Sequence, residues 1–147
     1  MSVPEKIFYA DIESYRRHFE SNYCAGPIVT FDGIPVHFRR NDFNHCMFES
    51  SMRNGIKDTF SFTRAQRINW IKETLTNPEA ELYFGYDKNK KQIRHDRRVS
   101  VVFEDFVVII GLKKENVAGN YRGWFITAFQ ADNSITKIKN MKKWERK

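Results

Sequence analysis

The chain has 147 residues, 41% of them hydrophobic and 15% aromatic, and its 25 Lys and Arg against 18 Asp and Glu give a net charge of +7. This length suits one domain, and the aromatic content excludes an intrinsically disordered chain. No apolar run reaches the roughly 18–20 residues that a membrane-spanning helix needs. The basic excess favours a polyanionic partner, with nucleic acid ahead of a membrane surface.

The first residues, MSVPEKIFYADIE, contain no apolar stretch of the signal-peptide type. Cys24 and Cys46 form no CxxC pair and are too few for a zinc site. We therefore expect a cytoplasmic protein in which both cysteines are reduced and act as small buried side chains.

The first half of the chain predicts a helix, a hairpin and a long loop. Residues 5–23 have the spacing of an amphipathic helix, with apolar side chains three or four residues apart at Phe8, Ile12, Tyr15 and Phe19. The strand patterns IVTF and IPVHFRR flank Asp32-Gly33, a dipeptide that suits a tight two-residue turn. Residues 41–62 show no sustained period, so we expect a loop with at most one helical turn.

The second half predicts one strong helix and a sheet. In TRAQRINWIKETLTNP, Thr63 and Gln66 form a capping box and Pro78 marks the end of the helix 63–76. Four strand patterns follow, ELYFGY, RRVSVVF, FVVIIGL and RGWFITAF, and their short or medium connections favour antiparallel pairing. The tail SITKIKNMKKWERK begins with a helical turn.

These elements predict a single α+β domain over residues 1–147. It consists of an N-terminal helical part, 1–27, and a core, 28–147. Helices and the hairpin are expected to pack on a four-stranded antiparallel sheet.

The predicted helix 63–76 carries two arginines near its apolar face. Arg64 falls on the same helical face as three apolar residues, Ile68, Ile71 and Leu75, and Arg67 lies at the edge of that face. A charged side chain among core residues needs a partner. Arg64 therefore belongs either to a phosphate-binding pocket or to a pair with a buried carboxylate, and the sequence leaves both open.

Other candidates come from a strand and a loop. In the last strand Thr127 is expected to share one face with Phe125 and Phe129. His45 lies in the long loop and is the best candidate for a general base, with His37 of the hairpin as the alternative. No spacing predicts a metal site or a glycine-rich phosphate loop.

Basic residues gather in two segments, 88–98 and 137–147. By default such segments are solvated. The same cations also suit a groove that follows a single-stranded nucleic-acid backbone, with aromatic side chains such as Tyr86 stacking on bases.

Three stretches together resemble the phage- and toxin-associated nucleases of the barnase/EndoU/colicin/RelE-like (BECR) fold: FNHCMF, FSFTRAQRINWIKETLTNP and GWFITAFQADNSITKIKNMKKW. The resemblance covers residues 36–144, most strongly 43–78 and 122–144. In that group helices precede a four-stranded antiparallel sheet, and an FxTAF/Y final strand is followed by a Lys-containing turn that ends in Lys-Trp. Gln130 stands where relatives often have proline.

The resemblance implies metal-independent cleavage of RNA, with tRNA as the expected substrate and no cofactor. His45 would act as acid or base, and Arg64, with Arg67 behind it, would bind the scissile phosphate. Thr127 would hydrogen-bond that phosphate, and Lys137 or Lys139 would add positive charge. The expected substrate-binding residues are Lys139, Arg98, Tyr86 and Lys57.

A toxin of this kind implies an acidic immunity or antitoxin protein that covers its basic cleft, and action in the cytoplasm of its own cell or of a target cell. Two other interpretations stay open. One is a non-catalytic nucleic-acid-binding module that uses the two basic segments, which would bind RNA in a salt-dependent manner without cutting it. The other is an interaction protein of a phage or mobile element, whose charge serves only solubility.

Overall fold

The computed structural model describes residues 5–49, 58–87, 92–114, 121–132, 134–141 and 143–144, without the side chains of residues 85–98, 114 and 134. The helices are α1 (Ile12–Phe19), the π-helix η1 (Glu20–Cys24), α2 (Asp42–Met47), α3 (Phe62–Ala65), α4 (Ile68–Thr76) and α5 (Ser134–Lys139). The strands are β1 (Ile28–Val29), β2 (Pro35–His37), β3 (Phe48–Glu49), β4 (Thr59–Phe60), β5 (Glu81–Asp87), β6 (Gln92–Phe103), β7 (Phe106–Lys114) and β8 (Tyr121–Gln130).

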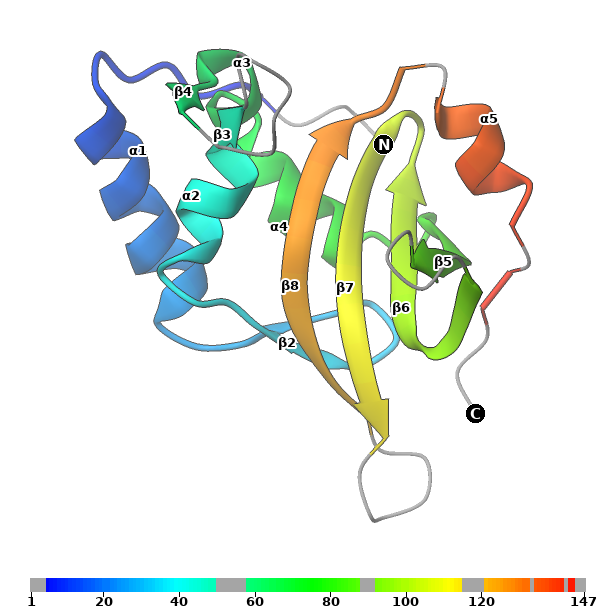
Figure 1. Cartoon of the computed structure of the whole chain (residues 1–147). Helices are drawn as coiled ribbons and strands as arrows, with labels where there is room; N and C mark the ends of the chain where they lie inside the picture. Colours follow the sequence, from blue (N-terminus) through cyan, green and yellow to red (C-terminus); the bar gives the residue numbers. More distant parts are fainter. Residues whose placement is uncertain are drawn as a thin grey trace.

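The main sheet has six strands in the order β1-β2-β8-β7-β6-β5 (Figure 1). Strands β5 to β8 form the predicted antiparallel meander. The prediction of a purely antiparallel four-stranded sheet is wrong, because the β1–β2 hairpin also joins the sheet and β2 runs parallel to β8. A two-stranded hairpin is marginal on its own. Docking on β8 buries its Val36 completely, and this burial favours the larger, mixed sheet.

The first helix is shorter than predicted. Its N-cap is Asp11, whose carboxylate accepts a hydrogen bond from the Ser14 amide at 2.8 Å, so residues before it are not helical. Phe8 is 71% exposed rather than part of an apolar helical face. The chain ahead of α1 is instead held by Tyr15, whose hydroxyl donates to the Ile7 carbonyl.

The hairpin loop has three residues and not two. The amide of Thr30 donates to the Ile34 carbonyl at 2.8 Å, so residues 31–33 form the turn. Gly33 has φ of 88°, the left-handed conformation that closes three-residue hairpin loops and that favours glycine.

The predicted helix 63–76 is two helices, α3 and α4, separated at residues 66–67. Its cap is Ser61, whose hydroxyl accepts from the Arg64 amide at 3.2 Å, whereas Thr63 is exposed and lies within α3. Pro78 follows the end of α4, as predicted. The stretch expected to be a loop contains α2 and the small β3–β4 sheet.

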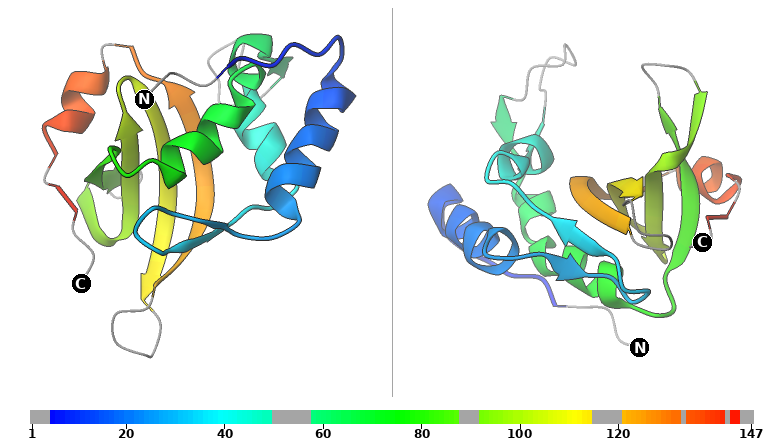
Figure 2. Two further views of the ribbon diagram at one scale, coloured as in Figure 1. Left: turned by 180° about the vertical axis from the view of Figure 1, so that it is seen from behind. Right: turned by 90° about the horizontal axis from the view of Figure 1, so that it is seen from below.

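The sheet separates two hydrophobic clusters. Helix α4 covers one face (Figure 2), where its apolar side chains pack against β7, and Phe19 of α1 contacts Phe38 and Phe125 in the same cluster. Helix α5 covers part of the opposite face, against Tyr83, Val102 and Val107. No helix within the described residues is long and apolar enough to cross a membrane.

A β-bulge in β8 decides which side chains reach each face. Thr127 pairs with Ile109 and Phe125 pairs with Ile110, so Ile126 is an extra residue that shifts the alternation. Phe125 packs in the cluster under α1 and α4, whereas Phe129 packs in the cluster under α5. The prediction that Phe125, Thr127 and Phe129 share one face is therefore wrong. Thr127 lies on the face of Ile109, which is the α5 side.

Candidate functional site

The sheet face opposite α4, here called the open face, is covered by α5 over only part of its area. On either side of it, α2 with β3–β4 and the far end of the β5–β6 hairpin project in the same direction (Figure 2, right). Exposed or half-buried side chains of β8 remain on this face, among them Arg122, Trp124 and Thr127. The open face is thus an accessible floor between two projecting segments.

At the lower end of this face a hollow of about 260 Å³, here called the basic hollow, is lined by His37, Arg39, Arg122, Gly123 and Trp124. The parallel pairing of β2 with β8 creates it, because His37 lies beside Trp124 in the ladder. Burial of Val36 and Phe38 turns the alternate residues, His37 and Arg39, toward solvent. Two guanidinium groups and an imidazole around one hollow favour an anionic ligand.

The indole of Trp124 forms the floor of the basic hollow. It lies directly on Gly111 of β7, because a Cβ atom built on Gly111 would be 2.1 Å from Trp124 Cε2 and 2.5 Å from its Nε1. Only a residue without a side chain allows this approach. The residue is half-buried and lines the hollow.

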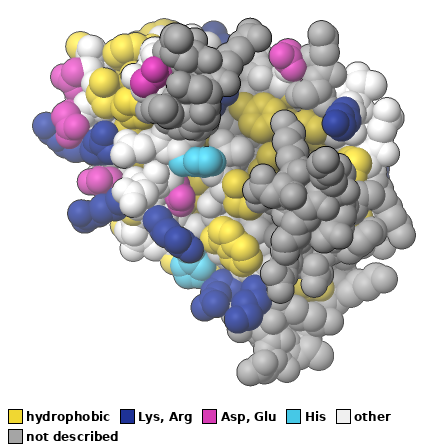
Figure 3. All heavy atoms as spheres, viewed as in Figure 1, with side chains coloured by type: hydrophobic (Ala, Val, Ile, Leu, Met, Phe, Trp, Pro, Cys, Tyr) yellow, Lys and Arg dark blue, Asp and Glu magenta, His cyan; other side chains and the backbone are white. Residues whose placement is uncertain are grey.

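His45, the histidine of α2, is exposed in the last turn of that helix. Figure 3 shows histidine side chains over α2 and over β2 on the open-face side, with apolar side chains and Lys or Arg beside them. These are the elements of His45 and His37. Two histidines from different elements therefore lie on the same side of the molecule.

Asp42 of α2 interacts with Arg39, one of the residues that line the basic hollow. Its carboxylate accepts a hydrogen bond from the Arg39 amide at 2.8 Å. Burial raises the pKa of this carboxyl, against the lowering effect of that hydrogen bond and of the positive charges of Arg39 and His45. Both Arg39 and His45 are thus close enough to act on the same carboxylate.

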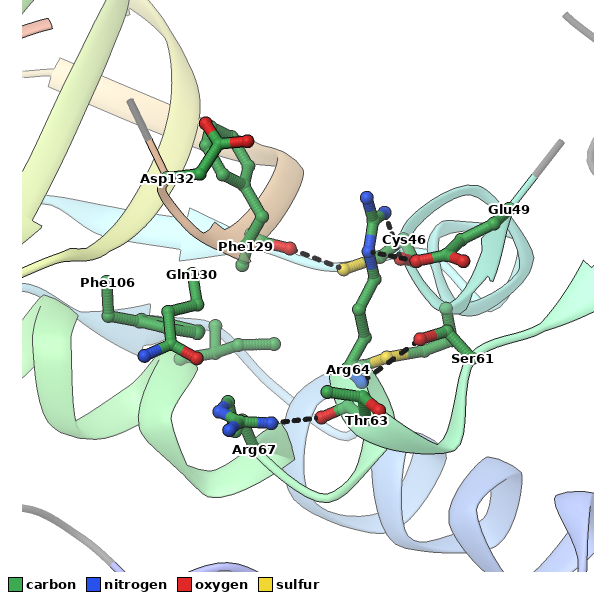
Figure 4. A pocket seen from close by; sticks show the side chains of 13 residues that line it. Cys46, Glu49, Ser61, Thr63, Arg64, Arg67, Phe106, Phe129, Gln130 and Asp132 are labelled. Carbon is green, nitrogen blue, oxygen red and sulfur yellow. Dashed lines mark hydrogen bonds and ion pairs between the residues drawn. The ribbon is translucent and has the colours of Figure 1, made fainter. Parts of the chain in front are cut away.

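A second cavity, of about 320 Å³, lies between α2, α3, α4 and the C-terminal end of β8, and we call it the edge cavity (Figure 4). Arg64 lines it, and Figure 4 shows its side chain directed to Glu49 and Cys46. Its Nη1 donates to the Cys46 carbonyl at 3.2 Å, and its Nε lies 3.3 Å from Glu49 Oε1. Of the two roles that the sequence left open, Arg64 has the carboxylate partner, although this carboxylate is exposed and not buried.

Arg67 lines the same cavity and is bound locally. Its Nη1 donates to the Thr63 carbonyl at 2.6 Å, and its guanidinium lies 5.2 Å from the centre of the Trp70 ring. Its Nε atom is buried and has no hydrogen-bond partner among the described residues. Arg67 thus contacts both of the helices that flank it, α3 at Thr63 and α4 at Trp70.

The structure divides the predicted site residues between two places. Thr127 is on the open face, and Lys137 and Lys139 are exposed on α5, which packs on that face. Arg64 and Arg67 line the edge cavity, and no described residue lines both this cavity and the basic hollow.

Three predicted substrate-binding residues stay without a described side chain. Lys57 lies outside the described residues, and Tyr86 and Arg98 lie in β5 and β6, where only the backbone is described. In the ladder, Arg98 pairs with Gly111.

The sequence did not predict Arg39, Arg122 and Trp124 as a group, and it indicated His37 only as an alternative to His45. The signal that could have found them is the alternation in IPVHFRR and RGWF, which turns basic residues and a tryptophan to one side. Their meeting depends on the parallel β2–β8 pairing, which the sequence did not predict.

The cysteines do not form a disulfide. Cys46 is buried, as expected, and its thiol donates to the Ala128 carbonyl at 3.4 Å, whereas Cys24 is only half-buried. Burial raises the pKa of the Cys24 thiol. Among the described residues no group of three or more His, Cys, Asp or Glu is placed to hold a metal ion.

Comparison with protein-family models, with curated proteins and with solved structures finds no match to this chain. The relation to BECR-fold nucleases therefore stays a prediction from the sequence.

Proposed function

We propose that the protein is a ribonuclease that cleaves RNA on the open face of its sheet, by acid–base transesterification without a metal ion. The observation that supports this best is the basic hollow, where His37 lies with Arg39 and Arg122 while His45 lies on the same side of the molecule. Proton-transferring and anion-binding groups on one accessible surface are what this reaction requires.

In the proposed reaction one histidine accepts the proton of a ribose 2′-hydroxyl. The 2′-oxygen then attacks the adjacent phosphorus, and a 2′,3′-cyclic phosphate forms as the bond to the 5′-oxygen breaks. The other histidine donates its proton to that leaving oxygen. His45 and His37 are the two candidates. They lie on α2 and on β2.

The arginines supply the charge that the reaction needs. Negative charge grows on the phosphate oxygens in the transition state, and guanidinium groups bind such oxygens with paired hydrogen bonds. Arg39 and Arg122 occupy this role in the basic hollow. The Thr127 hydroxyl and the α5 residues Lys137 and Lys139 are further phosphate contacts on the same side of the sheet.

Arg64 has a positioning role in this proposal and does not clamp phosphate. It holds the carbonyl of Cys46, the residue next to His45, and ties it to Glu49 of β3. By fixing the C-terminal end of α2, it fixes where the His45 imidazole stands over the open face.

The nucleophile decides the substrate class. DNA has no 2′-hydroxyl and cannot react in this way, so the activity is specific for RNA, with tRNA as the substrate to test first. An acidic protein that covers the open face would block it, as expected of the partner of a toxin.

The test is incubation of the purified protein with total tRNA in excess EDTA, with products separated on a denaturing gel. We expect discrete fragments ending in cyclic phosphate, lost in His45→Ala and in His37→Ala. Lys72→Ala is the control, because Lys72 is exposed on α4, the helix that packs on the other face of the sheet. Circular dichroism checks that every variant is folded.

The outcomes separate the proposal from its main rival. Cleavage at the normal rate by both histidine variants would refute the assigned site. Intact tRNA with wild-type protein, combined with binding whose logarithm falls linearly with the logarithm of salt concentration, would indicate a nucleic-acid-binding module without catalysis.

A further inference from the structure

We infer that Trp124 is a stacking platform for one unpaired nucleobase, so that the open face accepts single-stranded RNA and excludes duplex RNA. This inference rests on the proposed function, since it names the form of RNA that the same surface binds. It is carried by the contact between the Trp124 ring and Gly111.

The geometry of this contact leaves one ring surface for a ligand. Atoms from both rings of the indole, Cζ2 and Nε1, lie within 2.5 Å of the position that a Gly111 Cβ would occupy, so the ring is seated on the strand backbone. The ring also lines the basic hollow. A flat aromatic surface, supported from below and open above, is suited to stacking on a base.

The surroundings of the ring suit a nucleotide rather than an apolar ligand. Arg39, Arg122 and His37 line the same hollow, so a base stacked on Trp124 would have its phosphates next to cations. The other two tryptophans, Trp70 and Trp144, are only 9% and 6% exposed and lie in the core. Trp124 is therefore the tryptophan that is placed to meet a ligand.

Stacking on Trp124 requires a base that is not already paired and stacked. In A-form duplex RNA the bases are inside the helix, and a ring on the surface of a sheet meets only the sugar–phosphate backbone. Loops and single strands offer bases that can turn outward. The inferred preference is for unpaired segments, such as those in the loops of a tRNA.

The test measures binding separately from cleavage. The probe is a fluorescein-labelled eight-nucleotide RNA with 2′-O-methyl groups throughout, which has no free 2′-hydroxyl to react, used single-stranded and annealed to its complement. Fluorescence anisotropy gives the affinity, and tryptophan emission with the unlabelled probe reports stacking. We expect the single strand to bind more tightly than the duplex and to quench the emission.

Variants identify the ring as the cause. We expect Trp124→Ala to weaken single-strand binding roughly 5- to 150-fold, which corresponds to the range of about 1–3 kcal/mol for one stacked base. Trp124→Phe keeps a smaller aromatic surface and should lose less. Gly111→Ala should displace the Trp124 ring and weaken binding, although the indole itself is unchanged. Lys72→Ala is the control for non-specific charge effects.

Each result has a separate meaning. Equal affinity for single strand and duplex, or unchanged affinity in Trp124→Ala, would overturn the inference even if tRNA is cleaved. Single-strand binding that depends on Trp124, with no cleavage of tRNA by the wild type, would support the platform and refute the proposed reaction.

Discussion

Replacing Arg64 by methionine distinguishes the structural role that we assign to it from the phosphate clamp that the sequence also allowed. Methionine keeps much of the apolar stem and removes the guanidinium. Two contacts are lost, the hydrogen bond to the Cys46 carbonyl and the ion pair with Glu49. If these contacts hold α3 against α2 and β3, the variant must lose stability even with no RNA present.

The size of the loss follows from the two contacts. A hydrogen bond from a charged donor contributes about 1.5–3 kcal/mol. The ion pair contributes about 0–1 kcal/mol, because the side chains of Arg64 and Glu49 are 33% and 49% exposed. We expect Arg64→Met to lower the free energy of unfolding by about 2 kcal/mol, taking the low end of the first range for a partly exposed site.

Glu49→Gln is the matched variant, because it removes only the ion pair. It should cost less than about 1 kcal/mol. Urea unfolding of the wild type, both single variants and the double variant measures these values, and an unchanged m-value shows that the states compared are the same. The coupling between the two positions should not exceed the cost of Glu49→Gln alone.

Activity completes the test. Through the position of His45, Arg64→Met should lower kcat for tRNA cleavage and leave KM nearly unchanged, and Arg64→Lys should restore part of the rate. Wild-type stability of Arg64→Met together with a strong rise in KM would refute the positioning role, since that is the behaviour of a residue that binds phosphate directly.

Three further predictions concern the frame of the site. Ser61→Ala should destabilise the protein by about 1 kcal/mol and Thr63→Ala by less than half of that, because Ser61 is the cap of α3; a larger effect at Thr63 in thermal unfolding would contradict this. Tyr23→Phe should cost about 2 kcal/mol in urea unfolding, because the buried hydroxyl donates to Ile68 and accepts from the Lys72 amide. A cost below about 0.5 kcal/mol, the ordinary size of a surface substitution, would show that these bonds are not needed. Hydrogen bonding to Ser14 lowers the pKa of Asp11 in the folded protein. The ionised carboxylate therefore stabilises the fold at pH values above the pKa of an unfolded aspartate, and this stabilisation is lost as pH falls through the lowered pKa. Asp11→Asn keeps the cap, so its stability relative to wild type should rise as pH falls below about 4, and parallel pH curves would refute the assignment.

Periodic patterns made much of the fold predictable. The strands β5 to β8 and the apolar face of α4 depend on local alternation, which is visible in a single sequence. The break between α3 and α4 was not visible, because the residues on both sides of it favour a helix. In the structure Ala65, before the break, and Ile68, after it, are both fully buried.

The site was less predictable because it is built by contacts between distant segments. His37 and Trp124 are 87 positions apart in the chain and become neighbours through a parallel pairing of two residue pairs. No local pattern encodes which edge a short hairpin will join. The sequence could identify the basic character of the protein and a set of histidines, but it could not identify which cations would surround which histidine.

The bulge at Ile126 shows how a single residue changes the interpretation of a strand. With regular alternation, Thr127 would point to the same side as Phe125, into the aromatic cluster that Phe19 and Phe38 form with it. Burying a hydroxyl among these rings without a hydrogen-bond partner would cost free energy. The extra residue lets β8 bury Phe125 and Ala128 on one face and still present Trp124 and Thr127 on the other. Because the strand satisfies both the core and the open face only with this bulge, the sequence of β8 is a compromise between packing and the surface that we propose binds RNA.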